Sequence, residues 1–200
     1  SKVLFIAPIT SCSVHTGSGQ RTFHLYKSLA DFSQLDLLLV PERGSGVMSD
    51  LFPQWFAERF PLANKIFLLP GQSAQAASTG ANGKLSRFAR KARTALRSHA
   101  KTYIPDDSSI EYVKNLIDRE KYDFVVGRYL PATSRSGALN VNGLPVILDV
   151  DDREEKVLES RISSRTTPRL VKFLLKRQLS EVTHKSNELL RRGNHIWLAS

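Results

Sequence analysis

The chain has 200 residues, of which 41% are hydrophobic, and it carries a formal net charge of +10. This length suits one globular domain with a sizeable core. The single cysteine, Cys12, excludes an internal disulfide and a metal site built on cysteines, so we expect a cytoplasmic protein. No apolar run approaches the roughly 20 residues that cross a bilayer, and the apolar start is too short for a signal peptide.

Six short apolar runs predict β-strands. They contain many branched and aromatic residues, and they lack a clean alternation of apolar and polar positions, which favours a parallel sheet covered on both faces. The predicted strands are residues 3–7, 35–40, 65–69, 122–127, 145–150 and 195–199.

Helical patterns separate these strands, most clearly at residues 19–32, 108–120 and 169–192. Alternating strands and helices predict an α/β fold: a doubly wound, Rossmann-like parallel sheet with helices on both faces, in one domain covering residues 1–200. Residues 70–84 are small and polar without an apolar period, and they predict a mobile loop. The chain ends on a predicted strand, so we expect the natural protein to continue beyond it.

The first candidate site is the loop between the first strand and the first helix, residues 8–22. Gly17, Ser18 and Gly19 stand where the helix begins, so the backbone there can approach a ligand closely and the helix N-terminus can hold an anion. The alternative is a glycine-containing helix start without a ligand, since a dinucleotide fingerprint would need a third glycine where the chain has Thr22. His15, in the loop, is a candidate for contacting a substrate.

A strongly basic helix is predicted at residues 85–101. An apolar stripe runs along it, and the surrounding segment, residues 83–101, contains no acidic residue. This pattern is typical of a helix that lies on an anionic membrane surface, and the candidate contact residues are Arg87, Phe88, Arg90, Lys91, Arg93 and Arg97. The alternatives are a helix docked by its apolar side with a solvated basic face, and a nucleic-acid site, which the lack of interleaved aromatic residues disfavours.

Three aspartates lie at the end of the fifth predicted strand: Asp149 is within it, and Asp151 and Asp152 follow it. They are compatible with a Mg²⁺ or Mn²⁺ site, with a haloacid-dehalogenase nucleophile, or with capping of a helix through residues 153–160 by Asp151 or Asp152. Capping does not explain Asp149, which interrupts the apolar strand. A buried carboxylate needs a partner, and the candidate cations are Arg128, Arg153 and Arg161. Because ligands bind at the carboxyl ends of parallel strands, we expect Arg128, Asp149 and Asp151 to converge near the Gly17 loop.

Together these segments resemble the N-terminal domain of GT-B glycosyltransferases of the retaining group 4 type. The resemblance covers nearly the whole chain and rests on three stretches: "KVLFIAPI" with "GSGQRTFHLYKSLA", "YDFVVGRYLPA", and "LPVILDVDDREEKVLESR". It implies an acceptor-binding domain that works with a second, nucleotide-sugar-binding domain absent from this chain, with no metal or other cofactor required. The chain alone is then expected to be inactive.

The resemblance also implies roles for individual residues. Many members of the group carry a histidine at the position of Asp151, so Asp151 becomes the candidate catalytic residue, in contact with the acceptor or donor sugar rather than acting as a nucleophile. The residues implied in acceptor or donor binding are His15, Gly17, Ser18, Gly19, Arg128, Tyr129 and Asp149. The expected partners are a nucleotide-sugar, a glycan or lipid-linked acceptor and an anionic membrane surface on the cytoplasmic side, with no nucleic acid.

Two alternatives to this interpretation stay open. The first is a Mg²⁺-dependent phosphohydrolase or metal-dependent transferase centred on Asp149 and Asp151. The second is a non-enzymatic basic module that binds lipid or nucleic acid.

Overall fold

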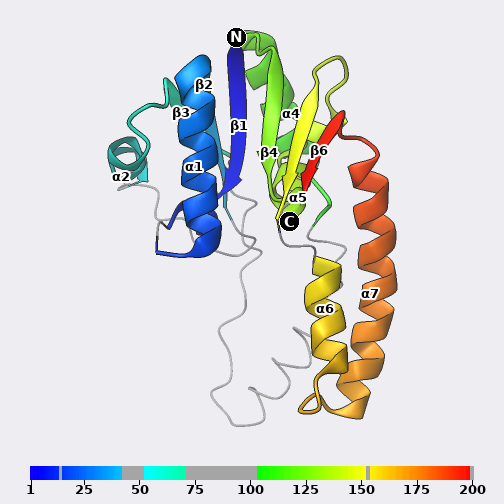
Figure 1. Ribbon diagram of the computed structural model, residues 1–200. Helices are drawn as coiled ribbons and strands as arrows, with labels where there is room; N and C mark the ends of the chain where they lie inside the picture. The colour runs from blue at the N-terminus through cyan, green and yellow to red at the C-terminus, as the bar shows by residue number, and fades with distance from the viewer. Residues whose placement is uncertain (14, 42–51, 71–102, 152–153, 199–200) are drawn as a thin grey trace, which may run out of the picture.

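The six predicted strands form one parallel sheet in a computed structural model that describes residues 1–13, 15–41, 52–70, 103–151 and 154–198. The strands pair in the order β3-β2-β1-β4-β5-β6 (Figure 1). Their bounds are β1 Lys2–Pro8, β2 Gln34–Val40, β3 Lys65–Leu68, β4 Phe124–Arg128, β5 Val146–Val150 and β6 His195–Leu198. The predicted α/β class and single Rossmann-like domain are therefore confirmed.

The strand order places a topological switch between β1 and β4. The chain moves outward from β1 to β2 and β3, and then returns to the other side of β1 to form β4, β5 and β6. In doubly wound sheets, ligands bind in the crevice at the carboxyl ends of the strands that flank this switch. The switch thus indicates where a functional site is to be sought.

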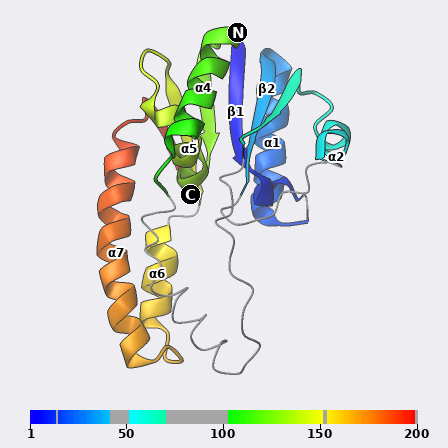
Figure 2. The same ribbon diagram turned by 180° about the vertical axis from the view of Figure 1, so that it is seen from behind.

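Helices cover both faces of the sheet (Figures 1 and 2). The core on one face joins α1 (Gly17–Phe32) and α2 (Phe52–Arg59) to the strands, and the core on the other joins α4 (Asp107–Glu120), α5 (Leu130–Ser136) and α7 (Arg169–Leu190). Strand alternation supplies both cores, since Val3 and Phe5 face α1 while Leu4 and Ile6 face the opposite layer.

The long helices begin and end close to their predicted bounds, whereas α2 and α5 were not predicted. Both contain a proline in the first turn, α2 has only 8 residues and α5 only 7, and α5 is buried without an amphipathic period, so neither sequence shows a helical repeat over several turns. α6 (Glu154–Ser163) and α7 form a hairpin that extends past the carboxyl ends of the strands (Figures 1 and 2). Among the described helices, none is long and apolar enough to cross a membrane.

A polar network closes the amino-terminal edge of the sheet. Asp36, which is fully buried, accepts hydrogen bonds from the Tyr122 hydroxyl (2.7 Å) and from Asn64 Nδ2 (2.8 Å). Beside it, Glu120 pairs with Lys2 Nζ at 2.8 Å and with Lys65 Nζ at 2.7 Å. The network thus links the starts of β1, β2 and β3 to the end of α4.

This network predicts an acid-sensitive contribution to stability. Hydrogen bonds from Lys2, then Lys65, and from Arg119 lower the pKa of Glu120 from 4.5 to about 2. Because the folded pKa is below the unfolded one, the ionised carboxylate stabilises the fold above about pH 4.5, and this contribution is lost as the pH falls toward 2. Glu120→Gln should therefore lower the free energy of unfolding in urea at pH 7, and by less at pH 3.

The matched control is Glu159→Gln, which removes an exposed pair with Lys156 on α6 and should change little. A Glu120→Gln effect that is as large at pH 3 as at pH 7 would contradict the assignment.

A candidate functional site at the carboxyl edge of the sheet

A buried ion pair lies at the carboxyl ends of β4 and β5. Arg128 and Asp149 are direct neighbours in the parallel register, and Arg128 Nη1 donates to Asp149 Oδ2 at 2.8 Å. Their side chains are 0% and 1% exposed. Alternation along the strands sends both side chains to the face covered by α1, because Val126 and Ile147, two residues earlier, belong to the core on that face. Of the candidate cations that the structure describes, Arg128 is therefore the one that pairs with Asp149.

A second arginine completes the pairing of Asp149. Arg21, in the second turn of α1, donates from Nη2 to Asp149 Oδ1 at 2.6 Å and from Nε to Oδ2 at 3.4 Å. This hydrogen bond to Asp149 raises the pKa of Arg21 above its ordinary value. The Arg21 side chain is 39% exposed, so the pair continues from the interior to the surface.

Asp151 lies on the opposite side of the Arg128 guanidinium. Arg128 Nη2 donates to Asp151 Oδ2 at 2.5 Å, and the Asp151 side chain is 20% exposed. The cluster thus has two cations and two carboxylates, and its surface-accessible members are Asp151 and Arg21. The site presents a carboxylate in a fixed position beside a guanidinium.

Further contacts hold Arg128 in place. Its Nε donates to Thr22 Oγ1 at 3.2 Å, and its Nη2 donates to the Ser18 carbonyl at 3.4 Å and to the Tyr129 hydroxyl at 3.3 Å. The Tyr129 ring lies against the guanidinium, 4.1 Å from Arg128 Cζ to the ring centroid. Thr22, which breaks the dinucleotide fingerprint in the sequence, therefore has a structural role as an acceptor for Arg128.

The backbone turns sharply after β4. Tyr129 has φ of 65° and ψ of 120°, a region that a residue with a side chain rarely adopts and that costs about 1–3 kcal/mol. Its N–H donates to the Asp149 carbonyl (3.0 Å), and its carbonyl accepts from the N–H and the hydroxyl of Thr133. A side chain at Gly127 would collide with Thr133, at 2.2 Å from its Oγ1. Close packing of β4 on α5 thus fixes the turn that places Tyr129 beside Arg128.

The two glycines of the predicted ligand loop differ in their surroundings. A Cβ at Gly19 would lie 1.6 Å from the Ser13 carbonyl oxygen, whereas a Cβ at Gly17 would meet nothing within 4 Å. Gly19 is thus required by the packing of the chain itself, and Gly17 is the glycine whose role in ligand approach stays a prediction.

Two other side chains of this loop differ in exposure. His15 is exposed, so it is accessible to a ligand. Cys12 is buried, and this burial raises the pKa of its thiol to about 12, so Cys12 is protonated at neutral pH.

The structure brings together most of the predicted site and adds residues that the sequence analysis missed. Arg128, Tyr129, Asp149, Asp151 and Ser18 meet at the Arg128 guanidinium, as the convergence of strand ends predicted; their function stays a prediction. Arg161, the other described candidate cation, is exposed on α6. Asp152, Arg153, residues 71–84 of the predicted mobile loop, and the candidate membrane residues Arg87, Phe88, Arg90, Lys91, Arg93 and Arg97 lie outside the described residues.

Three residues were missed: Arg21, Thr22 and Trp197. For Arg21 and Thr22 the only signal was their place in the first two turns of the helix that follows the loop. Trp197 pairs in register with Asp149 across β5 and β6, so it shares the same face of the sheet, and its side chain is 41% exposed. It adds an aromatic surface beside the cluster.

Metal binding at the aspartates is disfavoured by their hydrogen bonds. Both oxygens of Asp149 accept from guanidinium groups, and the described parts of the chain contain no group of three or more His, Cys, Asp or Glu side chains that could hold a metal ion. A cation would have to compete with two arginines for Asp149.

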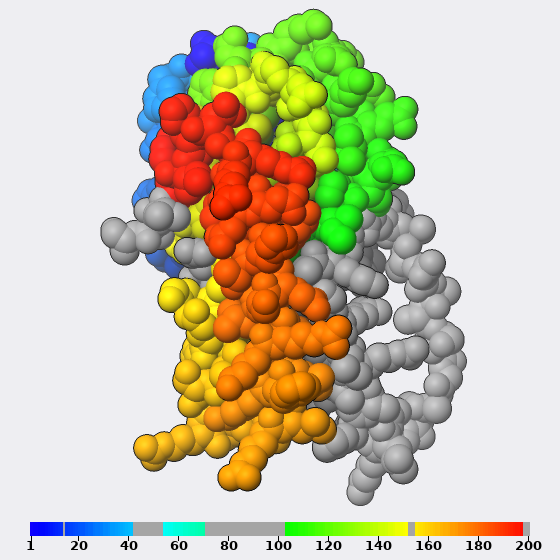
Figure 3. Space-filling view, turned by 90° about the vertical axis from the view of Figure 1, so that its right-hand side faces the viewer, coloured from blue at the N-terminus to red at the C-terminus, as the bar shows by residue number. Residues whose placement is uncertain are grey.

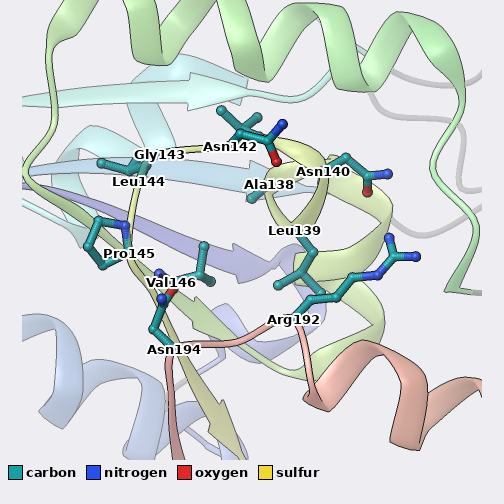
Figure 4. A pocket seen from close by; sticks show the side chains of 11 residues that line it. Ala138, Leu139, Asn140, Asn142, Gly143, Leu144, Pro145, Val146, Arg192 and Asn194 are labelled. Atoms are coloured by element: carbon teal, nitrogen blue, oxygen red, sulfur yellow. Dashed lines mark hydrogen bonds between the residues drawn. The ribbon is translucent and has the colours of Figure 1, made fainter.

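A hollow of about 680 Å³ lies at the opposite, amino-terminal edge of the sheet. Figure 4 shows its lining side chains, which come from the segment before β5 and from the connection between α7 and β6. Asn194 lines it and accepts from the Val146 N–H at 2.8 Å. Because this hollow is remote from the switch and from the ion cluster, the candidate site is placed at the carboxyl edge.

Comparisons with known proteins give no relative for this arrangement: no family model, no curated protein and no solved structure matches the chain.

The ion cluster predicts a large stability loss when one buried partner is removed. Arg128→Met should lower the free energy of unfolding by about 3–5 kcal/mol, because Asp149 stays buried with only its outer cation. Arg128→Met/Asp149→Leu should recover part of this loss, and urea unfolding measures both. Arg21→Met, at the exposed side of the cluster, is the milder control. If Arg128→Met lowered the free energy of unfolding by less than about 1 kcal/mol, the ion pair would not be stabilising the fold.

The glycine loop predicts opposite outcomes for two similar substitutions. Gly19→Ala should destabilise the fold by about 1–3 kcal/mol or more because of its collision with the Ser13 carbonyl. Gly17→Ala should be neutral or stabilising by about 0.4–1 kcal/mol, since the added methyl group enters open space and restricts the unfolded chain. Thermal unfolding of both variants tests this, and equal losses for the two would contradict it.

Proposed function

We propose that the chain is the acceptor-binding half of a retaining, metal-independent glycosyltransferase, which transfers a sugar from a nucleotide-sugar to a glycan or lipid-linked acceptor. The observation that carries the proposal is the partly exposed carboxylate of Asp151, held by the buried Arg128 at the switch point of the sheet. A ligand is expected at this position in a doubly wound fold.

The groups at the surface of the cluster suit a sugar. A carboxylate accepts hydrogen bonds from hydroxyl groups, and the salt bridge to Arg128 fixes the direction in which Asp151 does so. Arg21 has five N–H donors, of which Nε and Nη2 contact Asp149, so its exposed side has donors for a hydroxyl or phosphate oxygen. Acceptors and donors at fixed positions are what distinguishes one polyhydroxylated ligand from another.

Trp197 supplies the apolar complement. Its ring lies one strand away from Asp149 on the same face of the sheet. A partly exposed indole offers a flat apolar surface to the C–H face of a sugar ring, while its N–H can still meet a polar group. This pairing of an aromatic ring with charged hydrogen-bonding groups favours a sugar over a purely anionic ligand.

The remaining partners of the proposed enzyme are a second domain that binds the nucleotide-sugar and an anionic membrane surface contacted by residues 85–101. The competing Mg²⁺-dependent phosphohydrolase or metal-dependent transferase requires free carboxylate oxygens on Asp149, and the two arginines that occupy them weigh against it.

The test is turnover by the chain together with the proposed nucleotide-sugar-binding domain, assayed against nucleotide-sugars with EDTA present. Asp151→Ala should lower kcat/KM by about 10- to 100-fold, the cost of one hydrogen bond to a charged group, and Asp151→Asn by less because an amide oxygen still accepts. Asp31→Asn, an exposed acid near the far end of α1, is the matched control and should be fully active. Absence of turnover with every donor, or full activity of Asp151→Ala, would refute the proposal.

A further inference from the structure

The hairpin of α6 and α7 carries an acid-free basic segment. From residue 160 to residue 180 the chain contains no Asp or Glu and six basic residues: Arg161, Arg165, Arg169, Lys172, Lys176 and Arg177. Acidic residues bound the segment on both sides, at Glu159 and Glu181. The tip of the hairpin therefore has a local positive charge far above that of the rest of the described helices.

Two large apolar side chains stand exposed within this segment. Leu170 and Phe173, in the first two turns of α7, are 73% and 69% exposed, the highest values among the exposed large hydrophobic residues of the described chain. At 100° per residue they share one face of the helix with Arg169, Lys176 and Arg177, which are also exposed. The surface formed by these five residues is called the hairpin tip.

The hairpin tip lies beyond the sheet on the same side as the ion cluster. Figures 1 and 2 both show α6 and the first half of α7 extending past the carboxyl ends of the strands. Figure 3 shows α6 and α7 from the side as a projection whose long side chains stand out at its end. Arg128, Asp149 and Asp151 belong to the carboxyl ends of β4 and β5, so an object that meets the tip also approaches the candidate site.

We propose that the hairpin tip binds an anionic lipid bilayer, with Leu170 and Phe173 inserted among the headgroups and Arg169, Lys176 and Arg177 in contact with lipid phosphates. A pair of apolar side chains bordered by cations is the pattern of an interfacial helix, and each basic residue near such a surface strengthens binding roughly fivefold. The occupant follows from charge complementarity, because the three cations of the tip exceed the one acid at its border, Glu181, and such a surface matches a negatively charged one.

A bilayer fits the hairpin tip better than a protein partner does. The tip is a projection, whereas protein interfaces need a complementary surface around their apolar centre and are depleted in lysine. Acidic residues return in the second half of α7: Glu181 pairs with Arg177 at the border of the tip (3.5 Å), and Glu188 pairs with Lys185 (2.8 Å) and Arg192 (2.7 Å), which offsets part of the positive charge there. The basic and apolar character is thus confined to the end that extends away from the sheet.

This surface consists of other residues than 85–101, for which membrane contact was predicted from the sequence, and its binding to lipid does not depend on the proposed enzymatic function. A tip anchored in the headgroups would hold the carboxyl edge of the sheet toward the bilayer, where a lipid-linked molecule is presented. Vesicle binding and sugar transfer can therefore fail independently.

The experiment is co-flotation of the 200-residue chain with lipid vesicles at low and at high salt. The anionic vesicles contain phosphatidylcholine with about 30% phosphatidylglycerol, which imitates a strongly anionic leaflet. Vesicles of pure phosphatidylcholine are the neutral comparison. Wild type should float with the anionic vesicles and less well in high salt. Leu170→Ser/Phe173→Ser should reduce binding at least tenfold, and Arg169→Gln/Lys176→Gln/Arg177→Gln should reduce it by about 100-fold at roughly fivefold per charge.

Phe32→Ser is the matched control, because Phe32 is 66% exposed at the end of α1, near the opposite edge of the sheet. This control should float like wild type. A second variant measures how much residues 85–101 contribute to vesicle binding: Arg90→Ser/Lys91→Ser/Arg93→Ser/Arg97→Ser. Unchanged melting temperatures of the tip variants show that their folds are intact. Wild-type flotation of Leu170→Ser/Phe173→Ser, or tip-dependent binding to an oligonucleotide or a protein without vesicle binding, overturns the proposal.

Discussion

The burial of Arg128 against Asp149 is the constraint on which the carboxyl edge of the sheet depends. Two charges that are withdrawn from water must find partners inside the protein, because their desolvation costs several kcal/mol each. The Arg128 guanidinium meets this demand with Asp149, Asp151, Thr22 and the Ser18 carbonyl. These partners come from β5, the segment after it, and the first turns of α1, so one side chain joins three separate pieces of the fold.

Several local features of the fold help to meet this demand. The strained backbone of Tyr129 lays its ring on the guanidinium and brings its N–H to the Asp149 carbonyl. Thr22 uses its hydroxyl twice, as acceptor from Arg128 and as donor to the Ser18 carbonyl. Gly19 lets α1 start close against the Ser13 carbonyl, which sets where Arg21 and Thr22 lie. The main structural role of Gly19 in this loop is thus to bring α1 close to the ion cluster.

The fold could be predicted from the sequence because its signals are local, whereas much of the site could not. The strand at residues 3–7 is apolar throughout, the one at 35–40 is apolar except for Asp36, and the helices at 19–32 and 108–120 have a helical apolar period. Alternation of the two types therefore specifies a parallel sheet. Asp149 could be recognised because it interrupts an apolar strand, and Arg128 because it ends the neighbouring one. Arg21 could not, since it stands on a helix more than a hundred residues away and nothing in its surroundings shows which face meets β5. Trp197 could not be recognised either, because its place beside Asp149 depends on how β6 is registered against β5, and the sequence alone does not show that register.

Asp151 is best understood together with Arg128. Two arginines surround the single buried carboxylate of Asp149, and without a second acid the cluster would keep an uncompensated positive charge at the edge of the core. A neutral side chain at this position would not supply that charge. The arginine at position 128 therefore requires an acid at position 151. In homologous sequences, we expect a neutral residue at one of these positions to be accompanied by a neutral residue at the other. Charge balance and sugar contact do not compete for the same atom, since Arg128 engages Oδ2 while the partly exposed carboxylate has a second oxygen. The salt bridge that neutralises the cluster is also what would hold that second oxygen in place for a ligand hydroxyl.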